Sequence, residues 1–217
     1  MIGLFSNSIF PQRKEMRELI KPHSKVLCFS ASDIQWQKNN VDELLINGRY
    51  FNEQYAPFRE FGIDRGDFYI VTPYDSRDFV KWRVEHSDLI VLLGGYMENL
   101  TFKLKYYDIW DKLEGKNIIG ISAGALVLCD EYYILPNVDD YYVEYEIVEG
   151  IGLVENYRPL VHFRDTKEHW DNYSFVLKDC LKNKGIPIIL GDDEGILIDG
   201  KSIKFVGGSY ENNKIGG

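Results

Sequence analysis

The segment NIIGISAGALVL places a serine where it could act as a nucleophile. A short apolar strand runs into GISAG (residues 120–124) and then into an apolar helix. A G-x-S-x-G turn holds its serine in a strained backbone conformation, and it needs residues as small as Gly120 and Gly124 where strand and helix approach closely. The N–H of Ala123 is the expected donor to a developing oxyanion. The pattern indicates nucleophilic chemistry at Ser122, and a serine that only caps the helix is the alternative.

A serine hydroxyl is a poor nucleophile unless a base accepts its proton. The chain has four histidines, of which His162 directly follows the short strand expected at residues 158–161. A residue at the end of a strand lies where α/β sheets open into their binding crevice. His23 lies in a loop, His86 ends a helical stretch and His169 begins another. By position, His162 is slightly favoured as the base.

A carboxylate must orient the imidazole and stabilise its cation. The candidates are the turn that contains Asp139 and Asp140, and the run Asp192-Asp193-Glu194 in the sequence GDDEG. Glu194 stands where the chain enters the next strand, so its backbone should be held better than those of its neighbours. A solvated turn or a weak cation site is the alternative reading of GDDEG.

A second pair of glycines could complete an oxyanion hole. Gly94 and Gly95 end the apolar run that precedes the GISAG strand in sequence. If these two strands are neighbours in the sheet, the N–H of Gly95 reaches the same crevice as Ser122. An ordinary strand-to-helix turn is the alternative.

These residues need a framework that brings strand ends together, and the hydrophobic pattern predicts one. Short, nearly continuous apolar runs are typical of strands that are covered on both faces, as in a parallel sheet. Amphipathic helical patterns lie between them, which favours an α/β domain with right-handed crossovers. The expected strands are Ile2–Phe5, Val26–Phe29, Phe68–Val71, Leu89–Leu93, Ile118–Ile121 and Ile186–Leu190. The expected helical stripes are Phe79 and Trp82; Leu100, Leu104, Tyr107 and Trp110; and Trp170, Tyr173, Leu177 and Leu181.

Two hairpins should extend this framework. Residues 131–154 are rich in Tyr, Val and Ile and contain a turn cluster at residues 137–140, which predicts a β-hairpin added to the sheet. Residues 194–206 predict a second hairpin, which turns at Asp199-Gly200. We expect a single domain over residues 1–217, with a loosely held polar tail at 207–217.

Composition limits the classes of partner. The chain of 217 residues carries a formal net charge of −9, which disfavours a general nucleic-acid or membrane-surface binder. No apolar run approaches the roughly 20 residues of a membrane span, and the first residues do not resemble a signal peptide. The three cysteines are far apart and form no C-x-x-C pair, so reduced thiols in a cytoplasmic protein are expected.

Taken together, these motifs resemble peptidase family S51, the serine peptidases that include aspartyl dipeptidase (peptidase E) and cyanophycinase. The resemblance covers nearly the whole chain, in order. It is carried by Leu4-Phe5-Ser6-Asn7-Ser8, Leu93-Gly94-Gly95, Gly120-Ile121-Ser122-Ala123-Gly124, Val161-His162-Phe163 and Gly191-Asp192-Asp193-Glu194.

The resemblance implies a fold like the class I glutamine amidotransferases: an α/β three-layer sandwich with a mainly parallel sheet. It also implies Ser122 as nucleophile, His162 as base and no metal or cofactor. The acidic member would be Glu194 by analogy with cyanophycinase-like members, with Asp139 as the rival. The family's Arg-rich segment after the histidine has no clear equivalent in residues 164–170, so a strict preference for N-terminal aspartate does not carry over.

The favoured hypothesis is therefore a cytoplasmic serine peptidase that acts on short peptides as a monomer or homodimer. An esterase of the α/β-hydrolase type would also satisfy the order Ser122, Asp139, His162, although the sequence has no HGGG-type motif. A non-catalytic binding protein on the same scaffold is the third hypothesis, motivated by the unusual segment Tyr96–Asn99 after the glycine pair.

Overall fold

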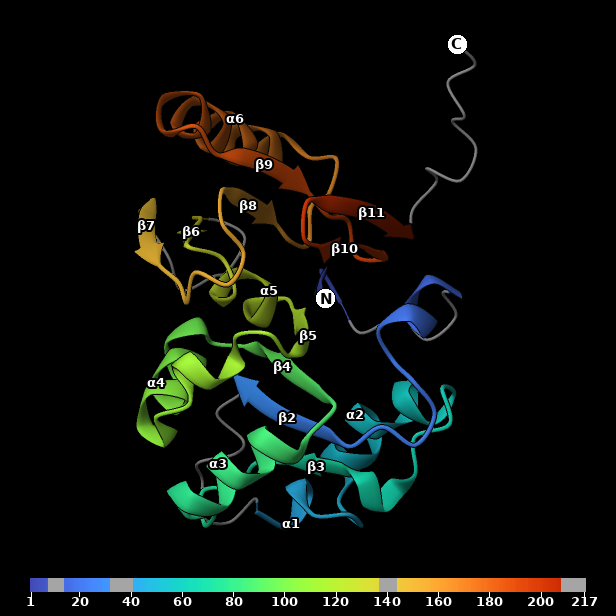
Figure 1. Cartoon of the computed structure of the whole chain (residues 1–217). Coiled ribbons are helices and arrows are strands. Elements are labelled where there is room, and N and C mark those ends of the chain that lie inside the picture. Colours follow the sequence, from blue (N-terminus) through green and yellow to red (C-terminus); the bar gives the residue numbers. More distant parts are fainter. Residues whose placement is uncertain (8–13, 32–40, 137–143, 208–217) are drawn as a thin grey trace.

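A computed structural model describes residues 1–7, 14–31, 41–136 and 144–207. Its central element is a seven-stranded sheet in the order β11-β10-β1-β5-β4-β2-β3 (Figure 1). The five strands from β1 to β3 in this order pair in parallel, and β10 and β11 add an antiparallel edge. The strands are β1 (Ile2–Phe5), β2 (Val26–Ala31), β3 (Phe68–Ile70), β4 (Leu89–Gly95), β5 (Asn117–Ile121), β10 (Glu194–Asp199) and β11 (Ser202–Gly207).

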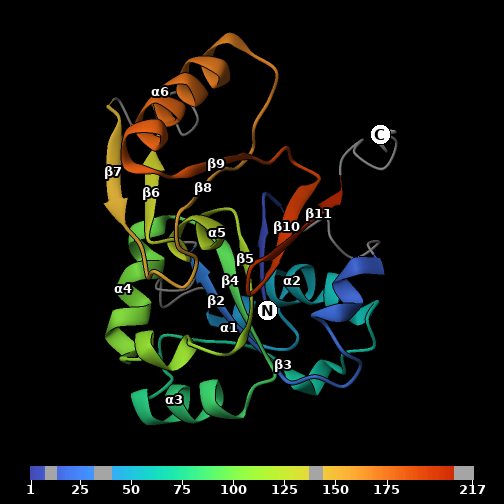
Figure 2. The same cartoon turned by 45° about the horizontal axis from the view of Figure 1, so that its top comes forward.

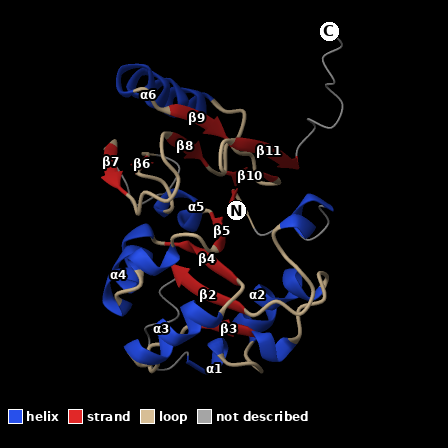
Figure 3. Ribbon diagram, in the orientation of Figure 1, coloured by secondary structure: helices blue, strands red, loops and turns tan. Residues whose placement is uncertain are grey.

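Helices cover both faces of this sheet, which gives three layers (Figure 3). One face packs with α3, α4 and α5, and the other packs with α2 and the segment around Met16. The helices are α1 (Val41–Leu44), α2 (Arg49–Arg59), α3 (Arg77–His86), α4 (Met97–Tyr107), α5 (Ala123–Val127) and α6 (Lys167–Asn183), with 3-10 turns at Lys14–Glu18, Arg65–Asp67 and Trp110–Leu113. None of the helices in the described residues is long and apolar enough to span a membrane.

The apolar runs form strands because both sides of the sheet are covered. On β5, Ile118 packs into one hydrophobic cluster and Ile119 into the cluster on the opposite face. Both side chains are fully buried, so the strand has no solvent-facing side that would require polar residues. The predicted α/β fold with a mainly parallel sheet is thereby confirmed.

The two hairpin predictions have different outcomes. The late hairpin is confirmed, because β10 and β11 pair antiparallel up to Asp199 and Ser202. The middle segment also forms an antiparallel pair, β6 (Glu131–Ile134) with β7 (Glu146–Glu149), but this pair is a separate two-stranded sheet. It is not added to the main sheet as the sequence predicted, and the expected turn residues 137–140 lie outside the described residues, as does the expected tail from residue 208 onward.

One predicted strand of the main sheet also lies elsewhere. Strand β9 (Ile186–Ile189) pairs in parallel with β8 (Tyr157–Leu160) in a second small sheet. Figures 1 and 2 show β6 to β9 and α6 gathered at one end of the molecule, away from α3 and β3. Short apolar runs indicate a strand but not its partner, so the sequence could not assign β9 to this smaller sheet.

Two predicted helical stripes also do not mark the buried faces. In α3 the buried residues are Val80 and Val84, while Trp82 is 50% exposed. In α6 the buried residues are Asn172, Val176 and Cys180, and the predicted stripe leaves Trp170 and Leu181 exposed. The buried face of α6 tolerates a polar residue because the Asn172 amide donates a hydrogen bond to the carbonyl of Pro136 at 3.1 Å. The stripe on α4 is confirmed at Leu100, Leu104 and Tyr107.

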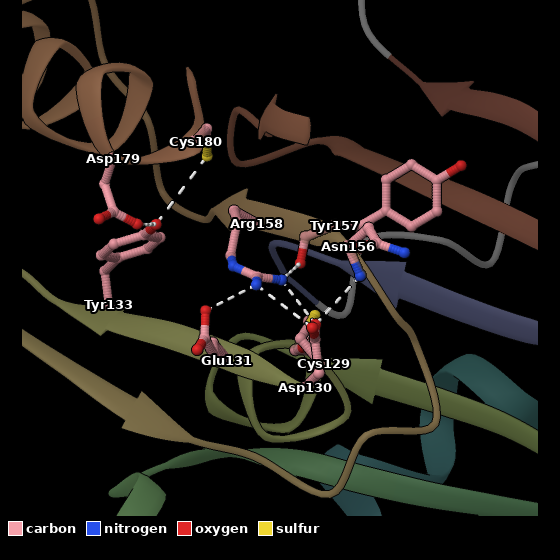
Figure 4. Close-up of polar contacts among 10 residues, drawn as sticks. Cys129, Asp130, Glu131, Tyr133, Asn156, Tyr157, Arg158, Asp179 and Cys180 are labelled. Carbon is pink, nitrogen blue, oxygen red and sulfur yellow. Dashed lines mark hydrogen bonds and ion pairs between the residues drawn. The ribbon is translucent and has the colours of Figure 1, made fainter. Parts of the chain in front are cut away.

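An ion cluster ties the two small sheets together (Figure 4). The guanidinium of Arg158, on β8, donates to both carboxylate oxygens of Asp130 at 2.6 and 3.2 Å, and to Glu131 at 2.7 Å. Asp130 also accepts a hydrogen bond from the N–H of Asn156. The Arg158 side chain is only 5% exposed, and two carboxylates compensate its charge. The cluster therefore fixes β8 against the start of β6.

Replacing Arg158 by Met should lower the free energy of unfolding by about 2 kcal/mol. Breaking a buried pair costs roughly 3–5 kcal/mol, and the loss should be smaller here because the carboxylates of Asp130 and Glu131 remain partly exposed to water. Urea unfolding measures the change. The control is Arg49→Met, which removes a highly exposed pair with Glu53 and should leave the free energy of unfolding nearly unchanged. Equal losses in both variants would contradict this account.

Candidate active site

The residues singled out by the sequence meet at the carboxyl ends of three neighbouring parallel strands. Ser122 follows β5, Gly94 and Gly95 end β4, and Ser6 follows β1. Strand β5 lies between β4 and β1 in the sheet. The strand that ends in the glycine pair is therefore a neighbour of the strand that leads to Ser122. Carboxyl ends of parallel strands are where open α/β sheets bind their ligands.

The turn at Ser122 has the strained geometry that its motif predicts. Ser122 has φ 52° and ψ −115°, a conformation that is uncommon for a residue with a side chain. A Cβ atom at Gly120 would lie 2.6 Å from the Gly124 carbonyl oxygen, and a Cβ at Gly124 would lie 2.0 Å from the carbonyl oxygen of Leu92. Only glycine allows strand and helix to approach this closely, and this approach presents the serine side chain at the sheet edge.

His162 comes from the small sheet and reaches Ser122. Its Nε2 lies 2.8 Å from Ser122 Oγ, within hydrogen-bond distance. The histidine follows β8 in a left-handed conformation with φ 55°. Its backbone N–H donates a 2.6 Å hydrogen bond to the hydroxyl of Ser6, and the next N–H, of Phe163, donates to the carbonyl of Leu190. The imidazole is thus held from the main sheet and from the loop after β9.

The carboxylate in contact with this imidazole belongs to Asp192. Its Oδ1 lies 2.9 Å from His162 Nδ1. Glu194, which the sequence analysis favoured, turns back instead and accepts a 2.8 Å hydrogen bond from the N–H of Gly191. Within the GDDEG loop, Asp192 and not Glu194 therefore contacts the imidazole. Glu194 closes a tight turn at the start of β10, and this turn directs Asp192 at its tip toward the histidine.

Asp139, the rival acid, lies outside the described residues. Ser6 also borders the site, although the sequence analysis named it only within the segment that carries the family resemblance and gave it no role. It is fully buried, and its hydroxyl also lies 3.5 Å from His162 Nδ1. Its position as a polar residue at the end of an apolar strand is a signal that could have pointed to such a role.

Residues 164–170, the segment that lacks the family's arginine cluster, lie close to Asp192. Arg164 is 69% exposed on its side chain, and its guanidinium lies 3.7 Å from Asp192. The backbone N–H of Arg164 donates a hydrogen bond to His169 Nδ1 at 3.2 Å. Burial, and then the charge of Arg164, lower the pKa of His169, which favours the neutral ring that this hydrogen bond requires.

The remaining expected residues line the same pocket. Gly95 and Ala123, the expected oxyanion donors, border it together with Ser122 and His162. A Cβ at Gly94 would come within 3.2 Å of the Ser122 Cβ, so the end of β4 lies directly against the serine. In the part of the chain that the structure describes, no group of three or more His, Cys, Asp or Glu side chains is arranged to hold a metal ion.

Comparison with protein families assigns the chain. The model of peptidase family S51 matches residues 46–206, which is most of the sequence. The chain belongs to peptidase family S51. No curated protein matches the sequence significantly.

A solved structure shares the S51 chain's fold. A crystal structure from Listeria monocytogenes EGD-e, provisionally described as a peptidase E protein, superposes with a TM-score of 0.62. The match covers 94% of this chain and 96% of the Listeria chain, at 17% sequence identity. The likeness extends through the whole architecture, which supports the predicted class I glutamine amidotransferase-like fold.

Substituting Gly124 by Ala should destabilise this S51 domain by about 1–3 kcal/mol or more, because the new methyl group would overlap the Leu92 carbonyl. Thermal unfolding should show a Tm several degrees lower, at about 2–4 °C per kcal/mol. Gly66→Ala is the matched control. A Cβ there meets no atom within 4 Å, so its Tm should stay the same or rise slightly. A Gly124→Ala protein as stable as the control would refute the close approach.

Proposed function

We propose that the chain is a serine peptidase that hydrolyses short peptides through Ser122, His162 and Asp192. The observation that carries the proposal is that His162 contacts both other residues. Its Nε2 lies 2.8 Å from Ser122 Oγ, and its Nδ1 lies 2.9 Å from Asp192 Oδ1. Membership of family S51 supports the reaction class.

In the proposed mechanism, Ser122 Oγ attacks the peptide carbonyl while His162 Nε2 accepts its proton. Asp192 accepts a hydrogen bond from His162 Nδ1–H, which fixes the tautomer and stabilises the imidazolium. The N–H groups of Ala123 and Gly95 would donate to the oxyanion. The imidazolium then protonates the leaving amine, and water, activated by the same imidazole, hydrolyses the acyl-enzyme.

Ser6 serves as a positioning residue in this mechanism. Its buried hydroxyl accepts the hydrogen bond from the His162 backbone N–H, so it holds the backbone of the histidine in its left-handed conformation. Such a conformation costs of order 1–3 kcal/mol and persists only where the surroundings enforce it. The imidazole is thereby oriented before substrate arrives, which is the condition for efficient proton transfer.

Ser122→Ala should reduce hydrolysis of a dipeptide panel by about 10⁴-fold or more and abolish labelling by a fluorophosphonate, because the attacking oxygen is gone. Amine release and mass mapping of the labelled peptide are the measurements. Ser174→Ala removes an exposed hydroxyl that bonds to the carbonyl of Trp170, and it should behave as wild type. Undiminished hydrolysis by the Ser122→Ala protein would end the proposal, and faster turnover of aryl esters than of dipeptides would favour the esterase hypothesis.

Asp192→Asn should lower kcat by about 10²–10⁴-fold with little change in stability. The amide cannot supply the negative charge that stabilises the imidazolium, and it can hold the wrong tautomer. Glu194→Gln is the matched control, since a glutamine oxygen can still accept the hydrogen bond from the Gly191 N–H. A large loss of kcat in Glu194→Gln with normal turnover in Asp192→Asn would reverse the assignment of the acid.

A further inference from the structure

A pocket of about 230 Å³ opens directly beside Ser122. This volume is below the roughly 300–1,000 Å³ of pockets that hold drug-sized ligands, so it suits one amino-acid side chain. Because Ser122, Gly95 and Ala123 all border the pocket, it lies alongside the carbonyl group that the proposed mechanism attacks.

Apolar side chains form much of the pocket lining, beside the polar side chains of Ser122, His162 and Tyr133. The apolar walls come from four parts of the fold: Met97 of α4, Leu126 of α5, Leu135 after β6, and Pro159 and Leu160 of β8. Among the described residues that line the pocket, none is a Lys, Arg, Asp or Glu. An ionised side chain that entered would therefore lose its hydration without gaining a partner of opposite charge.

Two polar side chains close to these walls, Tyr133 and Arg158, are already engaged elsewhere (Figure 4). Tyr133 lines the pocket, but its hydroxyl donates a 2.6 Å hydrogen bond to Asp179. Burial, followed by this hydrogen bond, raises the pKa of Tyr133, so the phenol stays neutral. Arg158 precedes the wall residue Pro159, but its side chain is only 5% exposed and its guanidinium is bound by Asp130 and Glu131. It is not available to receive a substrate carboxylate.

We propose that this pocket binds an apolar side chain of the residue whose carbonyl carbon is attacked by Ser122. The inference rests on the proposed function and adds the substrate class: peptides with a residue such as leucine or methionine on the acyl side of the cleaved bond. Acidic residues at that position are disfavoured. Because a methylene group in an apolar pocket changes selectivity by about 10–200-fold, truncation of the leucine to alanine should lower kcat/KM by more than tenfold.

The first test uses the wild-type protein and dipeptides that differ only in the acyl residue, with Leu, Ala, Asp or Lys before a common leaving residue. The Leu peptide should exceed the Asp and Lys peptides by at least about 100-fold in kcat/KM. Hydrolysis that depends on Ser122 but prefers Asp or Lys would overturn the pocket assignment and leave the peptidase proposal intact. Hydrolysis that is unchanged in Ser122→Ala would overturn the peptidase proposal itself.

A second measurement does not require turnover. Diphenyl phosphonates that carry a leucine-like or an aspartate-like side chain react with an activated serine. Their rates of Ser122 labelling measure how well each side chain fits the pocket. The leucine-like reagent should label faster by at least about tenfold. Equal rates, or faster labelling by the aspartate-like reagent, would contradict the proposal.

Leu135→Arg tests the wall itself, because Leu135 is only partly buried and should tolerate the change. The new guanidinium should move the ratio of Leu to Asp labelling toward Asp by at least about tenfold. Leu181→Arg makes the same substitution on an exposed position of α6 and should keep the wild-type ratio. A Leu135→Arg protein that still reacts with a fluorophosphonate but keeps the wild-type ratio would refute the role of this wall.

Discussion

The contact between Ser122 and His162 joins two separate parts of the fold. The serine comes from the main sheet, whereas the histidine and Asp192 follow the two strands of a small parallel sheet. Their 2.8 Å separation depends on how the small sheet is held against the main one. Ser6, at the end of β1, makes one such connection, because its hydroxyl accepts a hydrogen bond from the His162 N–H. Its own N–H donates to the Glu194 carbonyl at the start of β10, which anchors Ser6 within the main sheet.

The sequence was sufficient for the main sheet, because strands covered on both faces carry a continuous apolar pattern that periodicity detects. It was insufficient for the partners of β6 to β9. An apolar run such as Ile186–Ile189 could be buried in either the main sheet or a small one. Which strand it pairs with depends on long-range packing. The face of α6 was also misjudged, because hydrogen bonding allows Asn172 to be buried while Trp170 and Leu181 remain exposed.

For the site, motif and strand position led to Ser122, His162 and both glycine positions, and the structure brings these residues together. The acid could not be chosen in the same way. Asp192 and Glu194 lie two residues apart in one loop, and which carboxylate faces the imidazole depends on the hydrogen bond from the Gly191 N–H to Glu194. A turn of this kind is set by side-chain geometry that no spacing rule encodes.

The place of β1 has a consequence for assembly. It lies between β5 and β10, so residues 2–5 pair with residues 195–198, and Ser6 then orients His162. Contacts between segments so distant in sequence form late, because closing the intervening loop costs conformational entropy before the contacts compensate for it. A chain still being synthesised would hold Ser122 before the imidazole of His162 is oriented beside it, so the contact between these two side chains would be completed only late in folding.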